Sequence, residues 1–250
     1  GEEPRVAYDR VQLSAYFSGR SPQDLEMNPI DWYSSHNINI KTSAQVVSIE
    51  PSRKKVFLAN KESYTYDILI LATGSRAFVP SIPGVDKKNI FVYRTIEDVE
   101  AIAEQAKTAK TAAVIGGGLL GLEAAKALVD LKVENSHVIE FAPRLMPRQI
   151  DEAGSKLLQS KIEKLGVSIH LNQGTSEFIG DDFCTEMKFK DKSTLAVDMV
   201  VISAGIRPRD ELAKLAGIQV GKQGGIVVNN RMETSAKDIY AIGECALHND

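Results

Sequence analysis

The stretch that most constrains this chain runs from Thr111 to Ala125, where a short apolar run leads into glycines and then into helix-forming residues. Gly116, Gly118 and Gly121 have the G-x-G-x-x-G spacing, which permits a tight turn, close approach of a pyrophosphate and close packing of a helix on a strand. The pattern predicts a strand, a turn and a helix. Leu119-Leu120 would open that helix, where unpaired N–H groups and the helix dipole favour a phosphate.

An acidic residue supports a dinucleotide site. The run Ser136–Glu140 is typical of the next strand, and it ends at Glu140, 19 residues after Gly121. An acid at about this spacing accepts a hydrogen bond from the 2′-hydroxyl of an adenosine ribose. A carboxylate repels a 2′-phosphate, so we expect NADH over NADPH, although nearby Arg144 leaves NADPH as an alternative. The other interpretation is a structural βαβ unit with no ligand.

Composition narrows the class of protein. The 250 residues are 43% hydrophobic and 25% charged, which suits one large or two modest globular domains. The net charge of −3 is dispersed and predicts no nucleic-acid partner. No apolar run approaches the roughly 18 residues that span a bilayer, and no signal-peptide core is present. Cys184 and Cys245 share no metal-binding or redox spacing, so we expect a cytoplasmic protein with reduced cysteines, no membrane partner and no metal site.

The first half of the chain has strand patterns. Alternation of apolar and polar residues over Ile38–Ile49, answered by Lys55–Leu58, predicts antiparallel strands. Tyr66–Gly74 is almost uninterrupted in its apolar character, which predicts a parallel strand buried on both faces. It ends in Ala72-Thr73-Gly74, and ligands bind at such carboxyl ends in open α/β sheets.

The second half repeats this strand ending. Val197–Ile202 predicts another buried strand, and the following Ser203–Gly205 echoes the earlier ending, so we expect Gly205 near a cofactor. A last apolar strand, Asp238–Glu244, stops on Gly243 and Glu244.

A helix and a small β insertion lie between these strands. Asp151–Leu165 predicts a helix with one apolar face. That face would consist of Leu157, Leu158, Ile162 and Leu165. Aromatic and apolar residues around Gly180 predict an antiparallel insertion.

The order of these features resembles the pyridine nucleotide–disulfide oxidoreductase superfamily. A narrower likeness, which extends over essentially the whole chain, is to the N-terminal flavin region of the large subunits of NAD(P)H-dependent assimilatory nitrite reductases. The stretches that carry this likeness are Ala7–Ser14, Phe91–Asp98, Gly116–Ala125, His137–Arg144 and Tyr240–Ala246.

The resemblance implies an α/β fold in which a Rossmann-like NAD(P)-binding domain is inserted in a Rossmann-like FAD-binding domain, with a small antiparallel β meander. The NAD domain would comprise residues 98–210, and the FAD domain residues 1–97 and 211–250. We expect the FAD domain to be incomplete, because the superfamily's first glycine-rich fingerprint and its C-terminal helix are not found in this sequence.

The resemblance also implies contacts to FAD. Glu2 or Glu3 would bind the adenosine ribose of FAD, and Arg10 would lie against its pyrophosphate or ribose. The backbone of Val46 or Val47 would contact the adenine. Ala72, Thr73 and Gly74 would lie near the cofactor, and Gly243 and Glu244 would replace the family's Gly-Asp at the ribityl chain. Ala15 stands where related ferredoxin reductases have a lysine.

The function implied is transfer of a hydride from NAD(P)H to FAD and passage of electrons to downstream iron–sulfur and sirohaem domains of the parent enzyme. Glu123 is the candidate catalytic residue, because it could hold the nicotinamide end. The competing interpretation is an acid stabilised near a helix N-terminus by the dipole.

Two alternative functions and the oligomeric state remain open. The electron acceptor could be rubredoxin, ferredoxin or oxygen, as in an NADH oxidase. The chain could instead be a truncated nucleotide-binding fragment without turnover, which would retain little FAD yet bind a nicotinamide nucleotide. A homo-oligomer is also compatible with the sequence.

Overall fold

The computed structural model describes residues 1–248, which form two compact units. Unit 1 comprises residues 1–8, 26–76 and 206–248, and unit 2 comprises residues 9–25 and 77–205. Packing defines these units, whereas the expected domains were defined by cofactor. The division into FAD and NAD domains therefore stays a prediction.

Unit 2 is built on a five-stranded parallel sheet in the order β6-β13-β7-β8-β9. Its strands are β6 (Ile90–Val92), β7 (Thr111–Ile115), β8 (Asn135–Ile139), β9 (Val167–His170) and β13 (Met199–Ile202). All four residues of β13 are buried, as expected for a strand covered on both faces.

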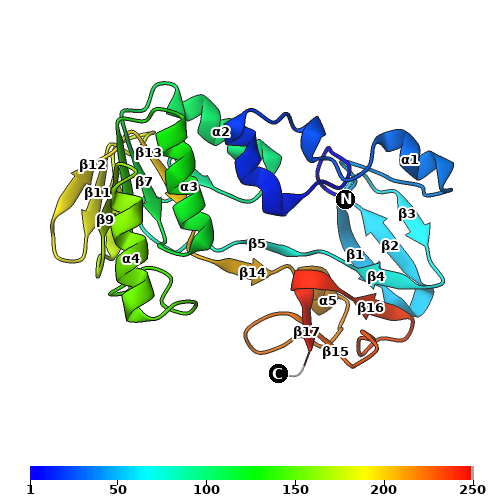
Figure 1. Ribbon diagram of the computed structural model, residues 1–250. Helices are drawn as coiled ribbons and strands as arrows, with labels where there is room; N and C mark the ends of the chain where they lie inside the picture. The colour runs from blue at the N-terminus through cyan, green and yellow to red at the C-terminus, as the bar shows by residue number, and fades with distance from the viewer. Residues whose placement is uncertain (249–250) are drawn as a thin grey trace. The chain divides into compact units, whose positions relative to one another are not determined.

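Helices and a meander cover the two faces of this sheet (Figure 1). The helical segments are η1 (Arg10–Ser18), η2 (Gln23–Leu25), α2 (Ile96–Ala106), α3 (Leu119–Asp130) and α4 (Glu152–Glu163). The meander consists of β10 (Thr175–Ile179), β11 (Glu186–Phe189) and β12 (Thr194–Ala196), which pair antiparallel as the sequence predicts. Ala113 and Ile139 pack against Met187 of the meander, so this sheet face is closed by β strands, while α3 and α4 cover the other.

The strand order creates a switch point beside β7. The chain proceeds from β7 to β8 and β9 on one side, whereas β13 and β6 lie on the other. Connections that leave a parallel sheet in opposite directions open a crevice at the carboxyl ends of the strands. The predicted strand, turn and helix of the glycine-rich stretch are confirmed, because β7 ends at Ile115 and α3 begins at Leu119.

Unit 1 consists of short strands around its own core. Its elements are α1 (Ile30–Ser35), β1 (Val46–Glu50), η3 (Pro51–Arg53), β2 (Lys55–Leu58), β3 (Ser63–Thr65), β4 (Leu69–Leu71), β14 (Ile206–Pro208), α5 (Glu211–Leu215), β15 (Ile226–Val228), β16 (Ile239–Ala241), η4 (Gly243–Cys245) and β17 (Ala246–His248). The strand β5 (Ser75–Ala77) pairs with β14. The predicted hairpin of β1 and β2 is confirmed, and β3 extends it. Ile49, Leu71, Ile226 and Ile239 form the centre of the core.

Three expectations on strands and faces are wrong. Residues 38–40 form no strand. The Tyr66–Gly74 run is a strand only over β4, which pairs with β16 and leaves Ile70 57% exposed, so it is not buried on both faces. The predicted helix ends at Glu163, so Leu165 lies in the turn after α4 and is exposed. Within α4, Leu157 is exposed while Leu158 and Ile162 are half-buried, because only part of the apolar stripe faces the sheet.

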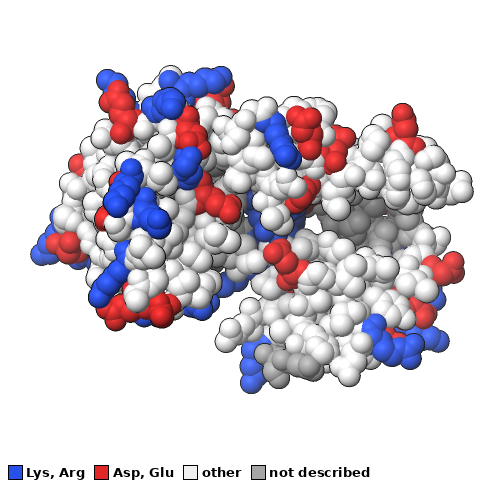
Figure 2. All heavy atoms as spheres, in the orientation of Figure 1, with Lys and Arg blue, Asp and Glu red and all other residues white. Residues whose placement is uncertain are grey.

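Charges of both signs are intermingled on the face shown in Figure 2. This agrees with the dispersed charge of the sequence. Within residues 1–248, no helix is long and apolar enough to cross a membrane.

Candidate nucleotide-binding sites

The glycine turn between β7 and α3 is fixed by backbone contacts. Gly116 has a φ of 118°, and a Cβ there would lie 2.2 Å from the carbonyl oxygen of Ser203 on the neighbouring strand end. A Cβ on Gly121 would lie 2.0 Å from the carbonyl oxygen of Gly116. Gly118, in contrast, has open space around its Cβ position. Two glycines of the motif are thus required by packing, while Gly118 leaves room above the turn.

The N-terminus of α3 lacks the caps that the other long helices of unit 2 have. Thr95 and Asp98 form a capping box on α2, and Asp151 accepts a hydrogen bond from Gly154 N at the start of α4. On α3 the cap residue is Gly118, no side chain caps the helix, and its first turn contains no acid. N–H groups without a side-chain acceptor and an uncompensated dipole make this a site for an anion.

Glu140 lies beside this turn, directly after β8. One carboxylate oxygen accepts a 2.5 Å hydrogen bond from Gly117 N and the other a 2.6 Å bond from Ala142 N. A Cβ on Gly117 would lie 3.0 Å from the carboxylate and 2.7 Å from Leu145. The acid is therefore held in place with capacity for further hydrogen bonds, and Gly117 is a site residue that the G-x-G-x-x-G pattern does not identify.

Arg144 and Gly205 have different surroundings. The Arg144 guanidinium donates to Pro147 O at 2.9 Å, so it is engaged within its own loop. Gly205 has a φ of 104° and follows β13 at the same sheet edge as the glycine turn. Its carbonyl oxygen accepts a hydrogen bond from Phe78 N.

Glu123 lies on the first turns of α3 and is half-buried, and burial raises the pKa of its carboxyl. Burial also raises the pKa of the 2%-exposed Tyr93, and the negative charge of Glu123 adds to that rise. The segment η1 packs on α2 and α3, and Phe17 contacts the Tyr93 ring. At the start of η1, Arg10 donates to Arg94 O at 3.0 Å. Glu123 thus shares a poorly hydrated environment with Tyr93.

The strand ends of unit 1 form a second candidate site. Since β4 and β16 are parallel neighbours, the turns Ala72-Thr73-Gly74 and Gly243-Glu244 lie at the same edge. Ser75 donates a 2.8 Å hydrogen bond to the Glu244 carboxylate and ties the turns together. Thr73 donates to Arg209 O at 2.5 Å, and Arg209 N donates to Gly74 O. Ser75 and Arg209 were not identified from the sequence.

The structure distinguishes the two N-terminal acids. Both terminal nitrogens of Arg209 donate hydrogen bonds to the Glu2 carboxylate, and this pairing raises the pKa of the arginine. Glu3 accepts a 2.7 Å hydrogen bond from the Tyr8 hydroxyl. Glu2 is thereby connected through Arg209 to the Thr73 turn. Of the two β1 valines, Val46 is half-buried and Val47 is 43% exposed.

The family model for pyridine nucleotide–disulphide oxidoreductases matches residues 1–249. The chain belongs to this family. It is 47% identical over 246 residues to the nitrite reductase [NAD(P)H] large subunit of Klebsiella oxytoca, covering 98% of this chain and 26% of that protein. It is 47% identical to the nitrite reductase (NADH) large subunit of Escherichia coli strain K12, covering 100% and 30%. The expected likeness to nitrite reductase large subunits is confirmed.

Solved structures and more distant relatives show how widely this fold is used within the oxidoreductase family. The ferredoxin reductase of the CYP199A2 system from Rhodopseudomonas palustris superposes with a TM-score of 0.93 at 30% identity, covering 99% of this chain and 61% of that one. An NADH oxidase of Methanocaldococcus jannaschii and a rubredoxin–NAD(+) reductase of Pseudomonas putida are 34% and 33% identical. The α/β fold expected for this oxidoreductase family is confirmed. The chain spans about a third or less of the nitrite reductases that it matches.

Proposed function

We propose that this chain is a flavoprotein reductase region that takes electrons from NAD(P)H through FAD to downstream redox centres, as in a nitrite reductase. The uncapped N-terminus of α3 beside Glu140 carries the proposal, because a dinucleotide needs both a pyrophosphate site and a ribose acceptor. Full-chain similarity to the nitrite reductase large subunits supports the choice of reaction.

Candidate site residues of unit 2 have proposed roles in binding the nicotinamide nucleotide. The first N–H groups of α3, from Leu119 to Gly121, would bind the pyrophosphate, and Gly118 leaves the backbone open to it. The ribose 2′-hydroxyl would donate to Glu140. Glu123 would contact the nicotinamide end, where its half-buried carboxyl orients the ring for hydride transfer. Gly205 keeps the neighbouring strand end free of side chains.

The turns of unit 1 fit FAD. Gly74 and Gly243 have φ angles of 65° and 74°, and nothing lies within 4 Å of a Cβ position on either, so the surface above both turns is open. Glu244 provides a carboxylate for the ribityl hydroxyls, and Glu2, oriented by Arg209, an acceptor for the adenosine ribose. When bound, FAD supplies a two-electron acceptor that can release electrons singly. The backbone of Val47 is the remaining proposed contact in unit 1, while the role of Arg10, which belongs to unit 2, stays a prediction.

The coenzyme preference tests the nucleotide site. We expect Glu140→Ala to lower the preference for NADH over NADPH roughly tenfold or more, because a hydrogen bond to a charged group is lost and repulsion of the 2′-phosphate ends. Dissociation constants of both nucleotides, measured by titration calorimetry, give the ratio. Glu123→Gln, which removes a charge on α3, should leave that ratio unchanged. An unaltered preference in Glu140→Ala would refute the assignment.

A different electron acceptor is the second candidate function. The likeness to an NADH oxidase and a rubredoxin–NAD(+) reductase supports it, since the sequence similarity to each extends over 98% of this chain. Steady-state reduction of nitrite, rubredoxin, ferredoxin and oxygen by the full-length parent separates these reactions. A nucleotide-binding fragment without turnover is the third candidate.

The location and partners follow from the proposed reaction. We infer a cytoplasmic protein, which the free, buried Cys184 and Cys245 support. NAD(P)H is the proposed small-molecule partner, and iron–sulfur and sirohaem domains of the parent are the proposed acceptors. Assembly into a homo-oligomer is a further proposal, open to sedimentation analysis.

A further inference from the structure

Phe141 is an exposed aromatic residue at the nucleotide site of unit 2. It directly follows Glu140, and 71% of its surface is accessible to water. Leaving a phenyl ring in water forgoes the free energy of its burial. Its place beside the proposed ribose acceptor gives this exposure a functional explanation.

The backbone on both sides of Phe141 is fixed. The Glu140 carboxylate holds Ala142 N, and Asn172 N donates to Ala142 O at 3.1 Å. Gln173 N donates to Glu140 O at 2.9 Å. Phe141 therefore projects from a rigid loop rather than from a free one.

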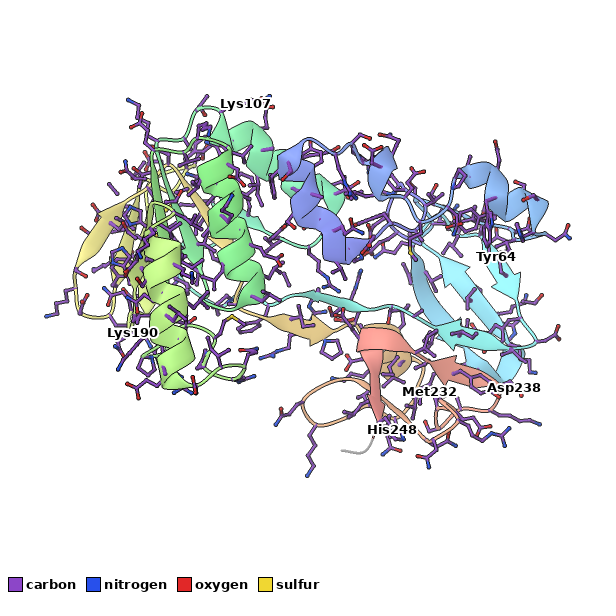
Figure 3. The ribbon with its side chains drawn as sticks, in the orientation of Figure 1. Tyr64, Lys107, Lys190, Met232, Asp238 and His248 are labelled. Atoms are coloured by element: carbon purple, nitrogen blue, oxygen red, sulfur yellow. The ribbon has the colours of Figure 1, made fainter. Side chains whose placement is uncertain are left out.

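The Phe141 ring is also supported from the side. The Lys190 ammonium lies 5.1 Å from the ring centroid, a cation–π contact. Lys190, labelled in Figure 3, directly follows β11. Gly174 permits this arrangement, because a Cβ there would lie 3.3 Å from the ring and 3.0 Å from the Lys190 chain. The ring is thus oriented while it stays exposed.

We propose that Phe141 is the stacking platform for the adenine of the nicotinamide dinucleotide, and that Lys190 holds the ring in its stacking orientation. This inference rests on the proposed function. The adenine is attached to the ribose carbon adjacent to the 2′-hydroxyl, so a ribose bound at Glu140 brings the base close to the next residue. Aromatic side chains stack on nucleobases through their π faces.

Three ligands separate the adenine from the nicotinamide end: NADH, ADP-ribose and reduced nicotinamide mononucleotide, which has no adenine. We expect Phe141→Leu to weaken binding of NADH and ADP-ribose by the 250-residue chain roughly tenfold, since stacking of one base contributes about 1–3 kcal/mol. Binding of the mononucleotide should not change. Phe141→Trp should keep the wild-type affinity for NADH and ADP-ribose, because tryptophan also stacks on a base. Lys190→Met should lower these two affinities by about threefold, within the range of an exposed cation–π contact. Calorimetric titration measures all of these.

A second Phe–Lys pair of unit 2 provides a matched control. Phe183 is 48% exposed, and the Lys88 ammonium lies 5.6 Å from its ring centroid. Phe183→Leu and Lys88→Met should leave all three affinities unchanged. The proposed stacking role of Phe141 would be overturned if Phe141→Leu bound ADP-ribose with wild-type affinity. It would also be overturned if this variant lost as much affinity for the mononucleotide as for NADH. Failure of the wild-type chain to bind NADH would instead overturn the proposed function, and the platform with it.

Discussion

At the scale of single residues, the three motif glycines have different reasons to be glycine. Gly121 and Gly116 are required by backbone packing, whereas Gly118 faces open space. The sequence predicts these three from their spacing alone. It does not identify Gly117, whose requirement comes from Glu140 and Leu145, residues more than twenty positions later in the chain.

This difference predicts the effect of adding one methyl group. We expect Gly121→Ala to destabilise the fold by at least about 2 kcal/mol, because the Cβ would lie 2.0 Å from a carbonyl oxygen that can move only with its strand end. Gly118→Ala should leave the free energy of unfolding nearly unchanged, because its Cβ meets nothing and its φ is −83°. Denaturant unfolding of both variants checks this. Equal stability of the two would contradict the packing argument.

At the scale of elements, adjacent strands bring together two histidines. His137 on β8 and His170 on β9 have ring nitrogens 3.1 Å apart, and both are half-buried. Burial lowers the pKa of both rings, and the neighbouring His170 lowers that of His137 further. The strand of His137 was predicted from the sequence, but the histidine pair was not, because the register of β8 and β9 decides which side chains meet.

The histidine pair predicts a pH dependence of stability. Both rings have lower pKa values in the folded than in the unfolded chain, so the unfolded state binds more protons as the pH falls below about 6.5. The contribution of the two histidines to stability is fully present above about pH 7.5 and should be lost progressively as the pH falls to 5.5. The double substitution H137Q/H170Q should flatten this dependence. The test is the free energy of unfolding of both proteins, measured from pH 7.5 to 5.5. An unchanged pH dependence in the double variant would mean that groups other than these histidines cause it.

At the scale of the whole molecule, the candidate sites of the two units differ in the helix that could bind a phosphate. Unit 2 has the twelve-residue helix α3 behind a glycine turn. Within the described part of unit 1, the longest helix is α1 with six residues, so its strand-end turns have no long helix to bind a pyrophosphate. A protein binds a dinucleotide more tightly when a helix N-terminus contacts the pyrophosphate than when no helix does.

We therefore expect the purified 250-residue chain to bind NADH but to retain little FAD. The absorbance spectrum of the purified protein measures retained flavin. Hydrogen exchange with and without NADH locates its site, with protection expected in residues 77–205. Stoichiometric flavin absorbance would contradict the first expectation, and protection confined to residues 26–76 would contradict the second.

The sequence by itself determined the family, the strand–turn–helix of β7 and α3, and the acid at Glu140, because these depend on local spacing and on residues close together in the chain. The tertiary structure decided what surrounds them: the Glu140 contact with Gly117, the Arg209 contact with Glu2, and the support of Phe141 by Lys190. These contacts join residues far apart in sequence, and strand order and register, which no local pattern specifies, bring them together.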